Sequence, residues 1–197
     1  MTGRIAVLAS GGGTNLQAVL DACASRTLDA QVVLVVSNRR HAFALKRARN
    51  ADVPAEHLPS TQFETRDRYD LALAELVAGS KPDLVILAGW MRILGATFLD
   101  AFPSRVLNLH PALPGAFPGL QAIERAHAAA VRGDITETGV MVHLAIPEVD
   151  AGPVVVSEPV VIDPTASVAT LEAQIHAVEH RLIVDAAKRT LNPGEIR

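Results

Sequence analysis

Asn108 and His110 stand two positions apart at the end of an apolar run that begins at Val106. The segment that follows, 111–119, contains three prolines and two glycines, so it continues neither as a strand nor as a helix. We therefore expect a buried strand whose carboxyl end carries an amide and an imidazole, which is where open α/β sheets hold their ligands. Because residues i and i+2 of a strand share one face, both side chains can meet one substrate.

A carboxylate can join this pair from further along the chain. Asp150 lies in a proline- and glycine-containing turn, 147–153, between two apolar runs. Asn108, His110 and Asp150 together have the chemistry of a general acid/base site with a donor for a developing oxyanion. The alternative is that His110 is a core histidine and Asp150 a turn former. No nucleophile is evident, since Cys23 falls on the apolar face of an expected helix.

The elements that position these side chains follow from apolar runs that alternate with helical patterns. Continuous apolar runs indicate strands covered on both faces, and hence a parallel sheet. Their alternation with helices indicates right-handed βαβ crossovers. The expected strands are 5–9, 31–37, 84–88 and 106–110, with a short one near 56–58, and the expected helices are 15–24, 42–51, 66–78, 95–102 and 122–132.

The last third of the chain has a different pattern. Two further apolar runs, 139–146 and 154–162, flank the Asp150 turn and predict a hairpin. A long helix over 167–190 follows, and Asn192-Pro193-Gly194 ends it. We find no repeat or linker. The expectation is one α/β domain over 1–197: a Rossmann-like, mostly parallel sheet with flanking helices, a C-terminal β-hairpin and a long terminal helix.

Composition restricts the class of protein. The chain has 197 residues, of which 49% are hydrophobic and 20% charged, so it is globular rather than disordered. A net charge of −3 argues against nonspecific nucleic-acid binding, and no apolar run approaches the ~20 residues of a membrane span. The early first strand leaves no room for a signal peptide, and one cysteine fits a reducing cytoplasm. We expect a cytoplasmic enzyme with small-molecule substrates and no nucleic-acid or membrane partner, as a monomer or homodimer.

A glycine-rich turn, Ser-Gly-Gly-Gly-Thr-Asn at 10–15, follows the first expected strand and opens the first expected helix. Glycines let the backbone approach an anion, and the helix N-terminus offers free N–H groups with a partial positive charge. Thr14 and Asn15 add side-chain donors or cap the helix. A phosphate is the expected ligand, and a tight turn without a ligand is the alternative.

A dinucleotide is a weaker interpretation of the same turn. The pattern G-x-G-x-x-G fits Gly11 and Gly13, but Leu16 stands where the third glycine belongs. The second expected strand ends near Arg39 and Arg40 rather than near an acid. Because arginines accept a 2′-phosphate, an NADP-binding oxidoreductase stays open as an alternative function. A Walker loop is excluded, since no G-K-[ST] is present.

Two other motifs have more than one interpretation. His176, Glu179 and His180 match the zinc pattern H-x-x-E-H, so a zinc hydrolase is a further alternative. A pentapeptide alone is weak evidence. We expect no metal, and favour His176 as a contact to a substrate phosphate and Glu179 as a contact to an amine or hydroxyl. In the segment 91–94, Arg92 stands among apolar residues, where it either clamps a flat ligand or packs.

Four segments, 10–17, 88–94, 108–111 and 149–153, resemble in order and spacing those of the phosphoribosylglycinamide formyltransferase family, folate-dependent enzymes of purine synthesis. The resemblance covers essentially the whole chain. The Asn-x-His-Pro motif with a distant Asp is shared by hydrolases and transferases of 10-formyltetrahydrofolate, while the Gly-Thr-Asn turn and the short length point to the glycinamide ribonucleotide branch. The resemblance implies formyl transfer to the amine of glycinamide ribonucleotide, with hydrolysis of the formyl-folate as the nearest alternative.

The resemblance also implies a role for each matching position. The catalytic residues would be Asn108, His110 and Asp150. The residues that hold the ribonucleotide would be Gly13, Thr14, Asn15, His176 and Glu179. The residues that line the pocket of the co-substrate 10-formyltetrahydrofolate would be Arg66, Met91, Arg92, Ile93, Leu94, Asn108, Ile146, Pro147, Glu148, Val149 and Asp150.

The chain departs from the commoner family pattern in the loop after His110. That pattern is His-Pro-Ser/Ala-Leu-Leu-Pro, whereas this chain has His-Pro-Ala-Leu-Pro-Gly at 110–115. The helix after it, from Gly119 to His127, is a few residues longer than in many bacterial relatives. His176 stands where some relatives place a phosphate-contacting lysine. The loop and the longer helix are typical of a sub-branch that includes fungal enzymes, and we expect these two features to change the loop geometry rather than the chemistry. The histidine at 176 bears on the phosphate contact instead, since it is only partly charged at neutral pH.

Overall fold

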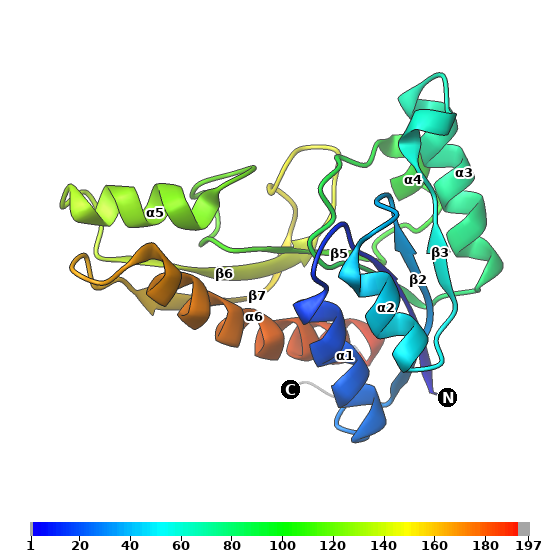
Figure 1. Cartoon of the computed structure of the whole chain (residues 1–197), viewed down its shortest axis with the longest axis horizontal. Coiled ribbons are helices and arrows are strands. Elements are labelled where there is room, and N and C mark those ends of the chain that lie inside the picture. Colours follow the sequence, from blue (N-terminus) through cyan, green and yellow to red (C-terminus); the bar gives the residue numbers. More distant parts are fainter. Residues whose placement is uncertain (1, 193–197) are drawn as a thin grey trace.

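The computed structural model describes residues 2–192 and is built on one seven-stranded sheet in the order β3-β2-β1-β4-β5-β6-β7 (Figure 1). The strands are β1 (Gly3–Leu8), β2 (Ala30–Ser37), β3 (Ala55–His57), β4 (Leu84–Leu87), β5 (Val106–His110), β6 (Glu137–Leu144) and β7 (Val154–Val161). The helices are α1 (Thr14–Ala24), α2 (Phe43–Asn50), α3 (Arg66–Gly79), α4 (Ala96–Leu99), α5 (Ala122–Val131) and α6 (Val168–Leu191), with a 3-10 turn η1 (Ser60–Gln62).

The first five strands pair in parallel, and β6 and β7 pair antiparallel with their neighbours. This arrangement confirms the expected mostly parallel sheet with a C-terminal hairpin and a long terminal helix. Most element ends lie within one or two residues of the expected positions. Within residues 2–192, no helix is long and apolar enough to cross a membrane.

The largest difference is α4, which has four residues where eight were expected. Its chain continues instead in tighter turns, because the amides of Ala101 and Phe102 bond to carbonyls only three residues back. Pro103 follows and has no amide hydrogen to donate, so an α-helix cannot extend through it. The turn η1 was not expected. Of the expected stop for α6, Pro193 and Gly194 lie outside the described residues.

The core has two parts, one on each face of the sheet. Ile5 and Val7 of β1 belong to the larger cluster, which the sheet forms with α1, α2, α5 and α6. Ala6 and Leu8 belong to the smaller cluster, which includes α3 and α4. Because both faces of β1 are covered, all its central residues are buried, which explains the continuous apolar run.

Two features of this fold position the site. In the antiparallel pairing of β5 with β6, Asn108 lies opposite His143 and His110 lies opposite Met141. The loop between β6 and β7 then returns toward β5 and brings Asp150 to it. On the other side, α6 packs against α1 and along the antiparallel strands (Figure 1). The last helix therefore meets the first at the glycine turn.

Candidate functional site

Asn108 and His110 share one face of β5 and both contact Asp150. The Asn108 amide Nδ2 donates to Asp150 Oδ1 at 3.0 Å, and His110 Nδ1 lies 3.3 Å from Asp150 Oδ2. His110 is only 4% exposed. Residues 42 positions apart therefore form one cluster, with the alternation of side chains along the strand that the sequence predicted.

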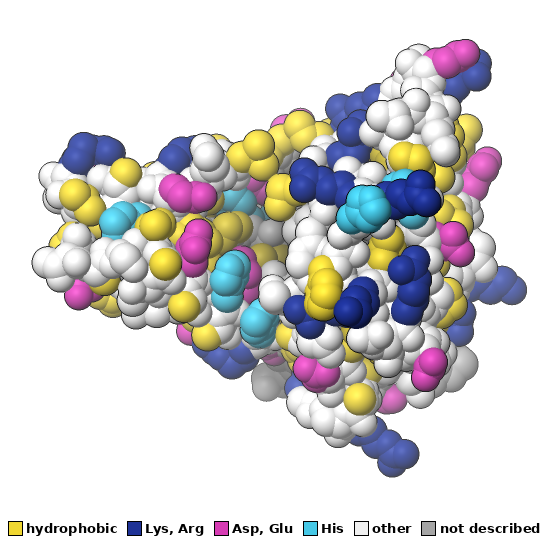
Figure 2. Space-filling view, viewed as in Figure 1, with side chains coloured by type: hydrophobic (Ala, Val, Ile, Leu, Met, Phe, Trp, Pro, Cys, Tyr) yellow, Lys and Arg dark blue, Asp and Glu magenta, His cyan; other side chains and the backbone are white. Residues whose placement is uncertain are grey.

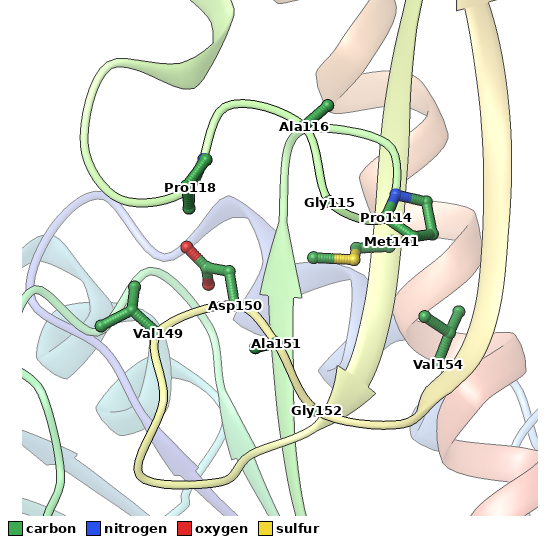
Figure 3. Close-up of a pocket in the computed structure, with 10 residues that line it drawn as sticks. All are labelled: Pro114, Gly115, Ala116, Pro118, Met141, Val149, Asp150, Ala151, Gly152 and Val154. Atoms are coloured by element: carbon green, nitrogen blue, oxygen red, sulfur yellow. The ribbon is translucent and has the colours of Figure 1, made fainter.

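The Asp150 carboxylate connects three segments of the chain. Besides its contacts to β5, it accepts a 2.8 Å hydrogen bond from the backbone N–H of Gly119. Figure 3 shows the side chain rising from the β6–β7 turn toward Pro118. Burial alone would raise the pKa of Asp150, but His143, the Gly119 N–H and His110 outweigh it and hold that pKa below its ordinary value. Asp150 is therefore ionised at neutral pH.

His143 is a member of this cluster that the sequence analysis did not identify. Its side chain is buried, and its Nδ1 lies 2.9 Å from the carbonyl oxygen of Leu144. A carbonyl only accepts hydrogen bonds, so Nδ1 carries a proton, and Nε2 accepts from Asn108 Nδ2 at 3.1 Å whenever it carries none. Nε2 also lies 3.7 Å from Asp150 Oδ1. Only the register of β6 on β5 could have revealed this contact.

The Asn108 amide therefore faces two acceptors within the site, His143 Nε2 and Asp150 Oδ1. The reversed orientation of the amide is unfavourable because its oxygen would face the carboxylate. Asn108 can act as an oxyanion donor only if it exchanges one of these hydrogen bonds for one to the ligand.

His110 is held between two acceptors. Its Nε2 lies 3.1 Å from the carbonyl oxygen of Phe117, and its Nδ1 faces Asp150. Burial lowers the pKa of His110, and the charge of Asp150 and the Phe117 carbonyl partly offset this effect. Burial favours the neutral ring, whereas the two acceptors favour the cation. Burial prevails and the pKa of His110 stays below its ordinary value, so the resting ring is mostly neutral at neutral pH and the two acceptors stabilise the cation once a proton is taken up.

The glycine turn has the features of an anion site. Gly13 has a φ of +70°, and a Cβ added there would lie 2.8 Å from Ala44 Cα, so the position requires glycine. The carbonyls of Gly11 and Gly12 are bonded to Ala44 N and Arg47 Nε of α2. Within residues 2–192, the backbone N–H groups of Gly12, Gly13 and Thr14 have no acceptor. These N–H groups lead directly into the N-terminus of α1.

A buried carboxylate links this turn to the last helix. Glu179 is 4% exposed, and its Oε2 accepts from Asn15 Nδ2 at 3.1 Å and lies 2.9 Å from His176 Nδ1. The hydrogen bond with Glu179 raises the pKa of His176, although partial burial opposes the shift. The five residues expected at the ribonucleotide, Gly13 to Asn15 with His176 and Glu179, therefore lie together at the junction of α1 and α6.

Positive charge surrounds the same turn. The segment 30–51 contains five Lys and Arg residues and no Asp or Glu. Figure 2 shows Lys and Arg side chains gathered over α2. Arg39 and Arg40, considered above for a 2′-phosphate, are exposed members of this group. The charge favours an anionic ligand at the turn.

The segments expected at the folate expose apolar side chains. Met91 and Ile93 are 52% and 56% exposed, and Ile146 and Val149 of the β6–β7 loop are also exposed. Leu94 instead packs in the smaller core. Exposed apolar side chains gather little stabilisation from water, so contact with a flat, partly apolar ligand would be favourable at this surface.

Charged residues brace the 91–95 segment from α3. Arg66 lies 3.6 Å from the buried carboxylate of Asp70, which accepts from the Gly95 N–H at 2.8 Å. The Arg92 guanidinium stands 5.1 Å from the centre of the Tyr69 ring. Gly95 and Arg92 are therefore anchored to α3, whose first residue is Arg66.

A cavity of about 440 Å³ opens beside Asp150, between the 111–119 loop and the β6–β7 turn (Figure 3). Pro114 and Gly115 line it together with Met141 and Val154. The two residues that depart from the commoner family pattern therefore form part of a wall beside a site carboxylate.

The zinc and nucleophile interpretations find little support in the geometry. Within residues 2–192, no group of three or more His, Cys, Asp or Glu side chains could hold a metal ion. His176 is engaged by Glu179, as described above. Cys23 packs against the larger core, and burial raises its pKa to about 11, which makes it a poor nucleophile.

The comparison with known proteins covers nearly the whole chain. A family model described as "Formyl transferase" matches residues 3–187. Curated proteins named phosphoribosylglycinamide formyltransferase from Schizosaccharomyces pombe and Dictyostelium discoideum are 42% and 41% identical. They cover 99% and 95% of this chain and 100% and 98% of their own lengths. The crystal structure of glycinamide ribonucleotide transformylase 1 from Geobacillus kaustophilus is 37% identical with a TM-score of 0.91, covering 97% of this chain and 100% of that one. The chain therefore belongs to the formyl transferase family, in its phosphoribosylglycinamide formyltransferase group, as the four motifs predicted.

Proposed function

We propose that this chain transfers the formyl group of 10-formyltetrahydrofolate to the primary amine of glycinamide ribonucleotide, a step of purine biosynthesis. Membership of the family supports the reaction. The observation that carries the assignment of residues is the Asp150 carboxylate, hydrogen-bonded to Asn108 and 3.3 Å from His110. One formyltransferase domain, 1–197, would hold both substrates.

The ribonucleotide binds with its phosphate at the glycine turn. The N–H groups of Gly12, Gly13 and Thr14 supply donors, and the basic side chains over α2 supply charge. His176 contacts the phosphate, and Glu179 holds the glycinamide end. The buried carboxylate of Glu179 supports this role because it can accept a hydrogen bond from the neutral primary amine and so orient its lone pair.

The co-substrate supplies an electrophilic formyl carbon attached to N10 of the folate. Met91, Ile93, Ile146 and Val149 cover its ring system with apolar surface. Arg66, Arg92, Pro147 and Glu148 complete this pocket, whereas Leu94, which packs in the smaller core, supports the segment from within. The residues fit an aromatic ring that carries an anionic tail, since the Arg92 cation stands in the chain between the exposed Met91 and Ile93.

In the reaction the amine nitrogen attacks the formyl carbon, and the bond from that carbon to N10 breaks. Negative charge develops on the formyl oxygen between the two events. Asn108 turns one N–H from Asp150 to that oxygen, and protonated His110 donates a second hydrogen bond when its Nε2–H turns from the Phe117 carbonyl to the same oxygen. Loss of one such donor commonly costs about 3 kcal/mol in the barrier.

Protons must also move, because the attacking nitrogen loses one and N10 gains one. His110 shuttles them through water, since an imidazole with an ordinary pKa of about 6.5 serves in both directions. Asp150 orients the ring and stabilises its cation across 3.3 Å. The scheme needs neither a covalent intermediate nor a metal ion.

The test measures release of the deformylated folate from a 10-formyl donor by absorbance, with and without glycinamide ribonucleotide. Turnover that requires the ribonucleotide supports the transferase. Turnover without it identifies a hydrolase of the formyl-folate and overturns the proposal. A thermal shift with NADPH and no turnover would instead favour the oxidoreductase alternative.

A further inference from the structure

Arg125 of α5 reaches back over the loop that follows the catalytic strand. Its Nη2 donates to the carbonyl oxygens of Phe117 at 2.6 Å and Pro118 at 2.7 Å. Its guanidinium carbon stands 5.8 Å from the centre of the Phe117 ring. Within residues 2–192, no carboxylate lies within ion-pair distance of Arg125. Its charge is therefore directed to the loop carbonyls.

The loop needs such a support because of its backbone conformation. Gly115 and Gly119 have positive φ angles, but so do Phe117 at +47° and Gln121 at +57°. Side chains other than glycine disfavour this region, so an isolated loop of this sequence would populate other conformations. Arg125 bridges two successive carbonyls at the centre of the stretch.

The carbonyl that Arg125 holds is the one that faces His110. Phe117 O lies 3.1 Å from His110 Nε2, and two residues later the Gly119 N–H donates to Asp150. Phe117 thus contacts His110 and Gly119 contacts Asp150, so one short stretch of loop touches both members of the acid/base pair. Arg125 binds the carbonyls of Phe117 and Pro118 in this stretch and does not touch the reacting atoms.

We infer that Arg125 is a positioning residue for formyl transfer, which fixes the Phe117 carbonyl so that it orients the His110 ring. The inference rests on the proposed function and adds a residue to which the family motifs assign no role. The exposed Arg125 acts on the reaction through the Phe117 carbonyl, which is the acceptor that orients the His110 ring. A displacement of a catalytic group by about 1 Å can cost up to 100-fold in rate, so the position of this carbonyl matters.

The sign of the effect on His110 can be argued from its surroundings. The ring faces the Asp150 carboxylate, His143 on β6, the carbonyl of Phe117 and, beyond that carbonyl, the cation of Arg125. A fixed carbonyl acceptor favours the protonated ring, whereas the Arg125 charge disfavours it. Because Arg125 is exposed to solvent, screening weakens its charge, and the loss of the fixed carbonyl should dominate.

The test compares Arg125→Met, which keeps an unbranched apolar stem, with Arg125→Lys, which keeps the charge but not the planar fork. For Arg125→Met we expect kcat to fall about 10- to 100-fold. The KM for the formyl-folate and the KM for the ribonucleotide should each change by less than about threefold. The pKa of His110, followed by NMR titration, should move to lower pH, and Arg125→Lys should recover part of both effects. Arg132→Met is the control, since Arg132 follows the same helix and pairs with Asp134.

Three results would overturn the inference. One is a kcat for Arg125→Met within twofold of the unmodified chain, and another is a shift of the His110 pKa to higher pH. The third is an increase in KM with kcat unchanged, which would indicate a binding role. If Arg125→Met fails to fold, the His110 titration in Arg125→Lys decides. The NMR titration needs no turnover, so failure of the proposed function and failure of this inference remain distinguishable.

Discussion

The side-chain amide of Asn108 donates a 3.0 Å hydrogen bond to Oδ1 of Asp150, although the two residues belong to different segments of the sheet and its loops. The second amide hydrogen points to His143. The proposed oxyanion donor is therefore preorganised by the groups that also hold the acid/base pair. Binding of the formyl oxygen and release of the Asp150 contact become linked events.

Replacing Asp150 by Asn should remove most activity while keeping the fold. The substitution removes the charge beside His110 and places an NH₂ group where donors from Asn108 and Gly119 now converge. We expect kcat to fall at least about 100-fold, measured with both substrates saturating. Asp134→Asn, which alters an exposed pair with Arg132, is the control. A rate within twofold of the original would show that Asp150 has no catalytic role.

Replacing Asn108 by Asp tests the same contact from the other side. Two carboxylates would then stand about 3 Å apart, and one of them would hold a proton to higher pH than usual. We expect kcat to fall about 100-fold or more, because the amide donor is lost. Thermal melting should show a larger loss of stability at alkaline than at acidic pH. A loss independent of pH would contradict the predicted closeness of the two groups.

Gly13 and Gly11 offer a matched pair at the phosphate turn. A Cβ at Gly13 would meet Ala44 in a left-handed backbone conformation, whereas a Cβ at Gly11 meets nothing within 4 Å. We expect Gly13→Ala to lower the free energy of unfolding by about 1–3 kcal/mol and to raise KM for the ribonucleotide. Gly11→Ala should leave unfolding nearly unchanged. Equal denaturation midpoints for the two variants would refute the steric argument.

His176 should make the stability of the chain depend on pH. Its pKa is raised in the folded state by Glu179, so its contribution is fully present below the unfolded pKa of about 6.5 and is lost as the pH rises through the folded value. In His176→Gln, the loss of stability relative to the unmodified chain should therefore be larger at about pH 5.5 than at about pH 8.5. Urea denaturation at the two pH values measures this difference, and the reverse order would contradict the assigned sign.

Ile93 tests the apolar surface proposed for the folate ring. Because it is exposed, Ile93→Ser should leave thermal stability nearly unchanged and raise KM for the formyl-folate about tenfold. The control is Val161→Ser at an exposed position of β7, 75% accessible, which should change neither quantity. A rise in KM for the ribonucleotide instead would place Ile93 at the other substrate.

The sequence predicts the architecture well because two patterns dominate it: continuous apolar runs at the buried strands, and helical spacing of apolar residues between them. Continuous apolar runs gave the parallel strands, and the parity of a strand placed Asn108 and His110 on one face. His143 and Arg125 were not predicted for a different reason. The contact of His143 depends on the register of an antiparallel pair, and that of Arg125 on a loop with left-handed residues. Neither the strand register nor the loop conformation follows from the local propensities of the residues.

The junction of α1 and α6 was predicted only in part from the sequence. The turn before Asn15 indicates an anion site from its glycines alone, but nothing local links it to Glu179. The polar residues His176 and Glu179 suggested that the last helix contacts a substrate, and the family resemblance assigned them to the same ribonucleotide as the glycine turn. The structure supplies the reason, since α6 packs against α1.

The contact between Asn15 and Glu179 also sets an order of events when the chain is made. The two residues are separated by 164 positions, which a ribosome needs on the order of ten seconds to add. Strands β1, β4 and β5, with the catalytic asparagine and histidine, have been synthesised well before α6. A nascent chain therefore has Asn108 and His110 before it has the Glu179 carboxylate proposed for the acceptor substrate, so activity can begin only after α6 has been made.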